Sequence, residues 1–162
     1  MSTMNVLICQ QPKELVWKQR EIPIPGDNEA LIKIKSVGIC GTDIHAWGGN
    51  QPFFSYPRVL GHEICGEIVG LGKNIADLKN GQQVAVIPYV ACQQCPACKS
   101  GRTNCCEKIS VIGVHQDGGF SEYLSVPVAN ILPADGIDPQ AAALIEPFAI
   151  SAHAVRRAAI AP

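Results

Sequence analysis

The segment VLGHEICGEIVGLG, residues 59–72, carries the pattern from which the fold prediction starts. Its part GEIVG, residues 66–70, is short and rich in branched side chains, which predicts a β-strand. Glycines within such a pattern indicate tight bends and the close approach of another backbone. His62 and Glu63 precede this strand, so two side chains of the kinds that bind metals are expected at its start.

Strand patterns recur on both sides of this segment. Each is short, contains branched or aromatic residues and ends at a turn signal such as the Pro-Gly-Asp run at 25–27. Strands of this kind without intervening long helices predict an antiparallel β-domain. The predicted strands are MNVLIC (4–9), ELVWKQR (14–20), EALIKIKSVGI (29–39), QQVAVIP (82–88) and FSEYLSVP (120–127).

The last part of the sequence has a helical pattern and not a strand pattern. Asp138 followed by Pro139 is typical of a helix N-cap with proline in the first turn, and an alanine-rich stretch follows. Pro147 lacks a backbone N–H and is expected to break or kink this stretch into two helical pieces. The helical segment is predicted over residues 138–160.

Composition narrows the classes of function. The 162 residues are 47% hydrophobic and 17% charged, which is typical of a compact domain. The 13 basic and 14 acidic residues nearly cancel, so neither nucleic acid nor an anionic membrane is expected as the main partner. The first apolar run, residues 6–9, is too short for a signal peptide or a membrane span, and a cytoplasmic location is therefore expected.

The stretch ACQQCPACKSGRTNCC, residues 91–106, contains five cysteines. Cytosolic thiols are kept reduced, which favours a metal site over disulfides. A ferredoxin run would place its fourth cysteine after three residues and follow it with proline, and this sequence does not. Four thiolates around one Zn²⁺ fit better and leave no open position for a substrate, so the predicted site is structural. The predicted ligands are Cys92, Cys95, Cys98 and Cys106, with Cys105 open as an alternative to Cys106.

A second set of metal-binding residue types is spread over three segments. They are GICGTDIHAWGG (38–49), the segment 59–72 already quoted, and EPF (146–148). Each residue alone has an ordinary explanation: a cysteine as a small buried side chain, a histidine in the core, a glutamate at a helix start. Cysteine, histidine and glutamate together are the ligand types of an open zinc site.

Taken together, these segments resemble the zinc-dependent medium-chain alcohol/polyol dehydrogenase family. Residues 61–72 match its GHE-x2-G-x5-G pattern in full, residues 40–45 match its C-G-T-D-x-H element, and the cysteines have its spacing. The resemblance covers essentially the whole chain. It implies one mainly β catalytic domain over 1–162, a GroES-like, partly open antiparallel β-barrel with short helices and a structural-zinc lobe at 91–107. The 138–160 helical segment would lead toward a Rossmann nucleotide-binding domain, which family members carry after the point where this sequence ends.

The resemblance also implies a set of ligands. Cys40 and His62 would bind a catalytic zinc, a carboxylate from Glu63 and a water or substrate oxygen would complete the shell, and Glu146 would be a direct or water-mediated ligand. The Glu146-Pro147 pair resembles the sorbitol and sugar-acid branch, in which glutamate replaces a cysteine of classical alcohol dehydrogenases. Bacterial L-galactonate and L-idonate 5-dehydrogenases are the most similar in appearance.

A proton relay is implied beside these ligands. Thr42 would accept the hydrogen bond of the substrate hydroxyl and pass the proton to His45, an imidazole being a natural end for such a relay. Asp43 would hydrogen-bond His62 and fix its tautomer. Aromatic residues that follow this element are candidates either for a substrate pocket or for the core: Trp47, Phe53, Phe54 and Tyr56.

The expected function is oxidation of a secondary alcohol of a polyol or sugar acid by hydride transfer to NAD or NADP, with two zinc ions per chain. No stretch predicts a nucleotide-binding βαβ unit, because GLGKNI at 70–75 lacks the third glycine of the fingerprint. The isolated chain is therefore expected to be inactive, and the full-length protein a homo-oligomer acting on a small molecule. The alternatives are a stand-alone zinc-binding interaction module and, with only Lys99, Arg102 and Lys108 to support it, a nucleic-acid-binding zinc ribbon.

Overall fold

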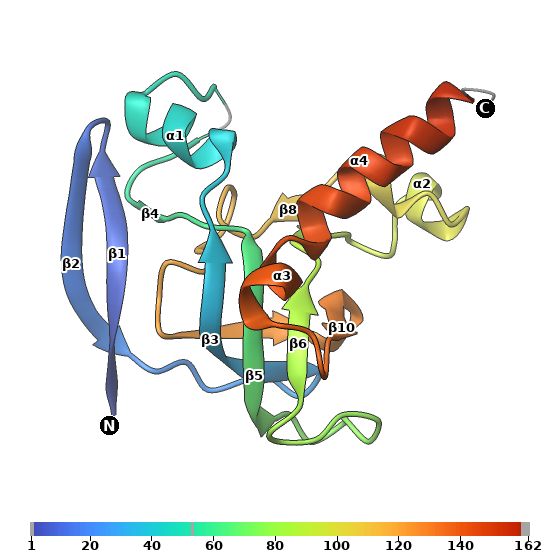
Figure 1. Cartoon of the computed structure of the whole chain (residues 1–162), viewed down its shortest axis with the longest axis horizontal. Helices are drawn as coiled ribbons and strands as arrows, with labels where there is room; N and C mark the ends of the chain where they lie inside the picture. Colours follow the sequence, from blue (N-terminus) through green and yellow to red (C-terminus); the bar gives the residue numbers. More distant parts are fainter. Residues whose placement is uncertain (1, 53, 160–162) are drawn as a thin grey trace.

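The computed structural model describes residues 2–52 and 54–159 (Figure 1). These residues form a mainly β structure of three sheets with four α-helices, as the sequence predicts. The order is β1 (Thr3–Gln11), β2 (Glu14–Glu21), β3 (Glu29–Gly38), α1 (Gly41–Gly48), β4 (Arg58–Val59), β5 (Glu63–Leu71), β6 (Gln83–Val86), β7 (Tyr89–Val90), α2 (Pro96–Lys99), the 3-10 turn η1 (Thr103–Cys105), β8 (Ser110–Val111), β9 (Tyr123–Pro127), the 3-10 turn η2 (Val128–Asn130), β10 (Ile131–Pro133), α3 (Pro139–Ala143) and α4 (Ile145–Ala158).

A five-stranded antiparallel sheet forms the centre of the fold, in the order β10-β6-β5-β3-β9. Apolar side chains from these strands pack into one cluster, in which Ile32, Ile68 and Val84 are fully buried. Burying such side chains stabilises the fold by about 1.5–3 kcal/mol each. All six predicted strands are present, and β5 begins at Glu63, three residues before the predicted start.

A second sheet consists of the β1–β2 hairpin and the short strand β4. Its buried residues Met4, Val6, Ile8 and Val59 form a separate cluster. An isolated bridge between Val6 and residue 121 joins this sheet to the segment before β9. Figure 1 shows the hairpin beside the central sheet, with α1 above its end.

The C-terminal stretch forms two helices as predicted, but the junction lies at Leu144 and not at Pro147. Asp138 caps α3 by accepting hydrogen bonds from the backbone N–H groups of residues 140 and 141. Pro147 falls in the first turn of α4, where an intrahelical N–H is not required. Helix α3 packs small buried alanines against β5 and β6, whereas α4 has no buried residue within its described part and extends away from the sheets (Figure 1).

Candidate functional site

Three of the predicted catalytic ligands lie together. The ligand atoms of Cys40, His62 and Glu63 are all within 4.8 Å of one another, and His62 and Glu63 are buried. Cys40 immediately precedes α1, whereas Glu63 is the first residue of β5. The site therefore forms where the end of β3 turns into α1 and meets the start of β5.

Asp43 connects the two segments that carry these side chains. It is 3% exposed, and its carboxylate accepts hydrogen bonds from the backbone N–H groups of Cys40 and Gly61, both at 2.9 Å. Nδ1 of His62 lies 3.9 Å from Oδ1 of Asp43 and has no hydrogen-bond partner among the described residues. Asp43 and His62 are thus neighbours, but the hydrogen bond predicted between them is not formed at this distance. The larger contribution of Asp43 is to hold both backbones in place.

Two glycines provide space for this arrangement. Gly61 has a φ of +88°, a conformation that side chains rarely adopt, and a Cβ there would also meet the Phe120 ring. Gly38 faces Glu63, and a Cβ at this position would collide with the Glu63 carboxylate. Glycine is therefore required at both positions if His62 and Glu63 are to keep their places.

The donor set fits a zinc ion. Glu63 is 7% exposed, and the described residues provide it with no salt-bridge partner. A buried carboxylate without a counter-charge is costly, and a divalent cation held by Cys40, His62 and Glu63 would supply that charge. A thiolate, an imidazole and a carboxylate are the donors that zinc accepts in sites with an open position.

Glu146 does not belong to the three-donor cluster. It lies in the first turn of α4, and its Oε1 accepts a hydrogen bond of 2.5 Å from the Tyr89 hydroxyl. Burial raises the pKa of Tyr89, and so do this hydrogen bond and the negative charges of Glu146, Cys40 and Glu63. The sequence analysis missed Tyr89, because a tyrosine after a strand has no ligand spacing to reveal it.

The two residues of the predicted relay lie on α1. The Thr42 hydroxyl is 3.7 Å from Sγ of Cys40, and His45 is exposed to solvent one turn further along. Residues three apart share one side of a helix, so the two side chains are neighbours on α1. No hydrogen bond links them within the described part of the chain.

The cysteine lobe brings four sulfur atoms together. Sγ atoms of the four predicted ligands lie within 4.8 Å of one another, and Cys92 Sγ is 3.9 Å from Cys98 Sγ. A tetrahedral zinc with Zn–S bonds of about 2.3 Å has sulfur–sulfur edges of about 3.8 Å. The cluster consists of Cys92, Cys95, Cys98 and Cys106, all of them free thiols, while Cys105 is exposed.

Backbone N–H groups point at these sulfurs. Sγ of Cys106 accepts hydrogen bonds of 3.3 Å from the N–H groups of Cys92 and Lys108. Hydrogen bonds from the backbone at Gln94 and Cys95 lower the pKa of Cys92 to about 6. Such bonds favour the thiolate form, which is the form that zinc binds.

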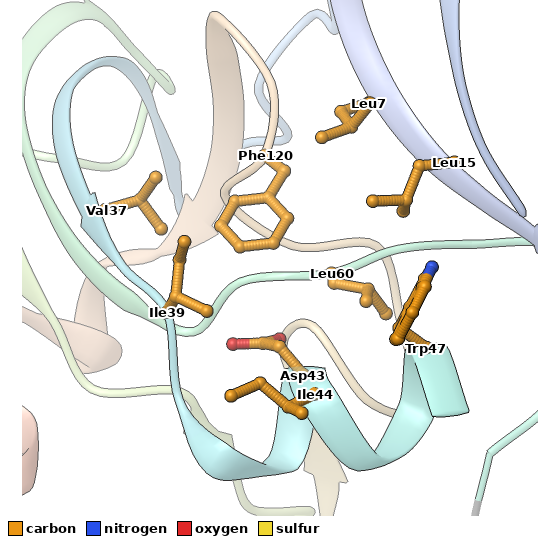
Figure 2. A pocket seen from close by; sticks show the side chains of 9 residues that line it. All are labelled: Leu7, Leu15, Val37, Ile39, Asp43, Ile44, Trp47, Leu60 and Phe120. Atoms are coloured by element: carbon orange, nitrogen blue, oxygen red, sulfur yellow. The ribbon is translucent and has the colours of Figure 1, made fainter. Parts of the chain in front are cut away.

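An apolar pocket of about 520 Å³ lies between the β1–β2 hairpin and α1 (Figure 2). Leu7, Leu15 and Trp47 face into it, and its lining includes Asp43, which hydrogen-bonds the backbones of Cys40 and Gly61. Of the aromatic residues that were candidates for a pocket or for the core, Trp47 lines this pocket. Phe54 and Tyr56 instead pack against a buried cluster, with the Tyr56 hydroxyl donating to the carbonyl of Ala46. Phe53 lies outside the described residues.

Comparison with known proteins identifies the family. The model of the alcohol dehydrogenase GroES-like domain matches residues 26–136, and the chain belongs to this family. Within the described residues, no helix has the length and apolar character needed to cross a membrane.

Relatives and solved structures agree with this assignment. The L-threonine 3-dehydrogenase of Legionella pneumophila (strain Philadelphia 1) is 38% identical over 156 residues, 93% of this chain and 46% of that protein. The crystal structure of the short chain alcohol dehydrogenase RspB from Escherichia coli CFT073, complexed with NADH, is 41% identical with a TM-score of 0.87, covering 94% of this chain and 44% of that one. Galactitol-1-phosphate dehydrogenase from Escherichia coli is 33% identical with a TM-score of 0.90, covering 96% and 45%. The chain thus spans about half the length of the curated relatives that it matches.

Proposed function

We propose that the protein is a zinc-dependent dehydrogenase that oxidises a secondary alcohol of a polyol or sugar acid, such as L-galactonate or L-idonate, with NAD⁺ or NADP⁺ as hydride acceptor. The observation that carries this proposal is the cluster of Cys40, His62 and Glu63, three zinc donors with a buried, uncompensated carboxylate among them. In the reaction, the carbon–hydrogen bond breaks with its electron pair going to the nicotinamide, the hydroxyl loses its proton, and a ketone forms.

Zinc, when bound, acts as a Lewis acid that lowers the pKa of a hydroxyl group. Cys40, His62 and Glu63 would hold it. Thr42 lies beside the Cys40 sulfur, where its hydroxyl would accept a hydrogen bond from the substrate hydroxyl and release its own proton toward His45 as it takes up that of the substrate. His45 is exposed one turn along α1 and would pass this proton to solvent. The Asp43 carboxylate holds the Cys40 backbone beside the segment that precedes β5, and this contact orients the metal donors.

The names of relatives support a substrate with a secondary hydroxyl. L-threonine carries one at carbon 3, and galactitol 1-phosphate is a polyol derivative. Two distinct substrate classes within one family are expected, because a GroES-like domain holds the metal while other parts of each enzyme shape the pocket. The complex of RspB with NADH supports a nicotinamide cofactor.

The test uses the whole protein encoded by the reading frame, loaded with zinc. Reduction of NAD⁺ or NADP⁺ is followed with L-galactonate, L-idonate and sorbitol as substrates. Activity with at least one hydroxy acid or polyol, abolished in Cys40→Ala and in His62→Ala, is expected. Full activity in Cys40→Ala would contradict the proposed site.

The 162-residue chain alone should not oxidise any substrate. All strand pairs among its described residues are antiparallel, so these residues provide no parallel βαβ unit to hold a dinucleotide against the substrate. Reduced cofactor produced by residues 1–162 alone would contradict this reasoning. The cytoplasmic location and the homo-oligomeric state expected from the sequence stay predictions.

A further inference from the structure

Strand β2 forms a free edge of the hairpin sheet. The order of that sheet is β2-β1-β4, and β2 pairs with β1 alone within the described part of the chain. Figure 1 shows β2 at the outer side of the molecule, beyond β1. Its residues from Trp17 to Glu21 are exposed, and Trp17 is 71% exposed. Such an edge presents backbone groups that can pair with another strand.

The backbone groups available for pairing belong to alternate residues of β2. The Leu7 N–H donates to the carbonyl of Phe120, and the Asn5 carbonyl accepts from the N–H of Glu122. These residues of β1 therefore use their backbone groups on the side away from β2. Because hydrogen-bonded pairs alternate along antiparallel strands, the even-numbered residues form the hydrogen bonds between β1 and β2. The outward N–H and C=O groups of β2 are thus those of Leu15, Trp17 and Gln19.

A second copy of β2 complements this edge when the two strands run antiparallel around Trp17. In that register Trp17 lies opposite Trp17 of the second copy, and Leu15 lies opposite its Gln19. All the outward groups then meet as hydrogen-bonded pairs. The two indole rings lie on the same face of the joined strands, where side chains directly opposite each other are in contact range.

Charged side chains toward the ends of β2 are complementary in the same register. Lys13 lies opposite Glu21 of the second copy, and Glu14 lies opposite its Arg20. Opposite charges in facing positions stabilise a strand pair, whereas like charges destabilise it. A register centred one residue further along would place Lys18 opposite Lys18. The sequence of β2 therefore favours pairing about Trp17 over that alternative.

The residues of β2, all of which the structure describes, do not protect the edge. Natural edge strands are often protected by proline or by an outward lysine. Strand β2 contains no proline, and Nζ of its one lysine, Lys18, is bound to Oε1 of Gln10 in the same hairpin at 2.8 Å. Leu15 is also 45% exposed. Exposed tryptophan on an unprotected edge is typical of an interface and not of a solvated surface.

We propose that β2 is a self-association surface, on which two copies of this protein pair antiparallel about Trp17 and join their hairpin sheets into one. The contact is small, since each copy contributes one strand of eight residues. A dissociation constant in the micromolar range is therefore expected. No step of the proposed reaction depends on this pairing, so its failure would leave the proposed function intact.

The first test is sedimentation of the whole protein at concentrations from about 1 to 200 μM, which bracket a micromolar dissociation constant. Gln19→Pro removes an outward N–H while the hydrogen bonds to β1 are kept. We expect its dissociation constant to rise at least about 10-fold, so that the mass at high concentration falls by half. Gln19→Thr is the matched control, because it keeps the N–H, and its mass should be unchanged. Urea denaturation verifies that both variants are folded.

A charge exchange tests the register without a change to the backbone. Neither Lys13 nor Glu21 has a salt-bridge partner among the described residues. Lys13→Glu and Glu21→Lys should each raise the dissociation constant about 3- to 10-fold, because each places like charges opposite one another. The double variant should restore the original value. Damage to the fold by the single changes would not be repaired in this way.

Oxidation with diamide tests which residues face each other. In the proposed pair, the two Cα atoms at position 17 are about 5.5 Å apart, which a disulfide can span, and Trp17→Cys should give a covalent dimer. In Gln19→Cys the two cysteines are separated by about four residues, or roughly 13 Å, and should not be linked. Equal cross-linking of the two variants would overturn the proposal. So would a monomer at every concentration, or an association unchanged in Gln19→Pro.

Discussion

Replacing Asp43 by asparagine should both destabilise the protein and weaken the metal site. The Asp43 carboxylate is almost fully buried and accepts from two backbone N–H groups, those of Cys40 and Gly61. Asparagine has nearly the same shape but only one accepting oxygen, so one of the two N–H groups would face an NH₂ group. The substitution therefore changes hydrogen bonding without creating a cavity.

The size of the effect follows from these two bonds. Leaving one buried N–H unpaired costs about 1–3 kcal/mol, and turning the other bond from charged to neutral costs about 1 kcal/mol. We expect the free energy of unfolding to fall by about 2–4 kcal/mol. Zinc affinity of the Cys40 site should fall about 10- to 100-fold, because Asp43 orients the ligand segments.

Urea denaturation and competition with a zinc chelator measure the two effects. Asp77→Asn is the matched control, since Asp77 is exposed and its carboxylate makes no hydrogen bond in the described structure; a change below about 0.5 kcal/mol is expected. If Asp43→Asn unfolds at the same urea concentration as the unmodified protein and retains its zinc affinity, the Asp43 carboxylate does not hold the Cys40 and Gly61 segments together.

Three further predictions concern the metal sites. Metal analysis should find two zinc ions per chain, with the Cys40 site stripped by chelator before the four-cysteine site, because the latter is closed by four protein ligands; at most one zinc in a zinc-replete preparation would contradict this. Cys106→Ser should lose the lobe zinc and destabilise the lobe, whereas Cys105→Ser should be nearly silent, since Cys105 is exposed; the reverse result would make Cys105 the ligand. Gly38→Ala should weaken zinc binding by displacing the Glu63 carboxylate, while Gly70→Ala, whose Cβ would make only ordinary contacts, should leave the affinity unchanged when both are titrated with zinc.

The sequence predicted the strands because their signals are local. Alternating branched residues between turn signals predict the ends of β1, β2 and β3 to within two residues. The division into two helices was predicted correctly, but its position was wrong. Proline is compatible with the first turn of α4 and does not interrupt the helix there. Helix α1 was not predicted at all, because the glycines and the histidine in Gly41–Gly48 obscure its pattern.

The candidate sites also differ in whether their sequence signal is local. The four cysteines lie within residues 92–106, and their spacing alone indicated a metal site. Cys40 and His62 required a family resemblance, because they come from separate segments and neither has a revealing spacing to the other. The contact between Tyr89 and Glu146 joins residues 57 positions apart, and only the packing of α4 against the strands brings them together. No short sequence pattern predicts such a contact.

This difference in sequence separation has a thermodynamic consequence. The lobe closes a short loop, so its four thiols stay close together even in a chain whose other contacts are lost, and they can still hold a metal ion. Cys40 and Glu63 come together only when β3, α1 and β5 are folded, and an unfolded chain therefore has no comparable site for the metal. A ligand that binds only the native state adds its binding free energy to the stability of that state. Zinc in the Cys40 cluster should thus stabilise the central sheet as a whole, whereas zinc in the lobe stabilises mainly the lobe and the strand that leads from it to Tyr89.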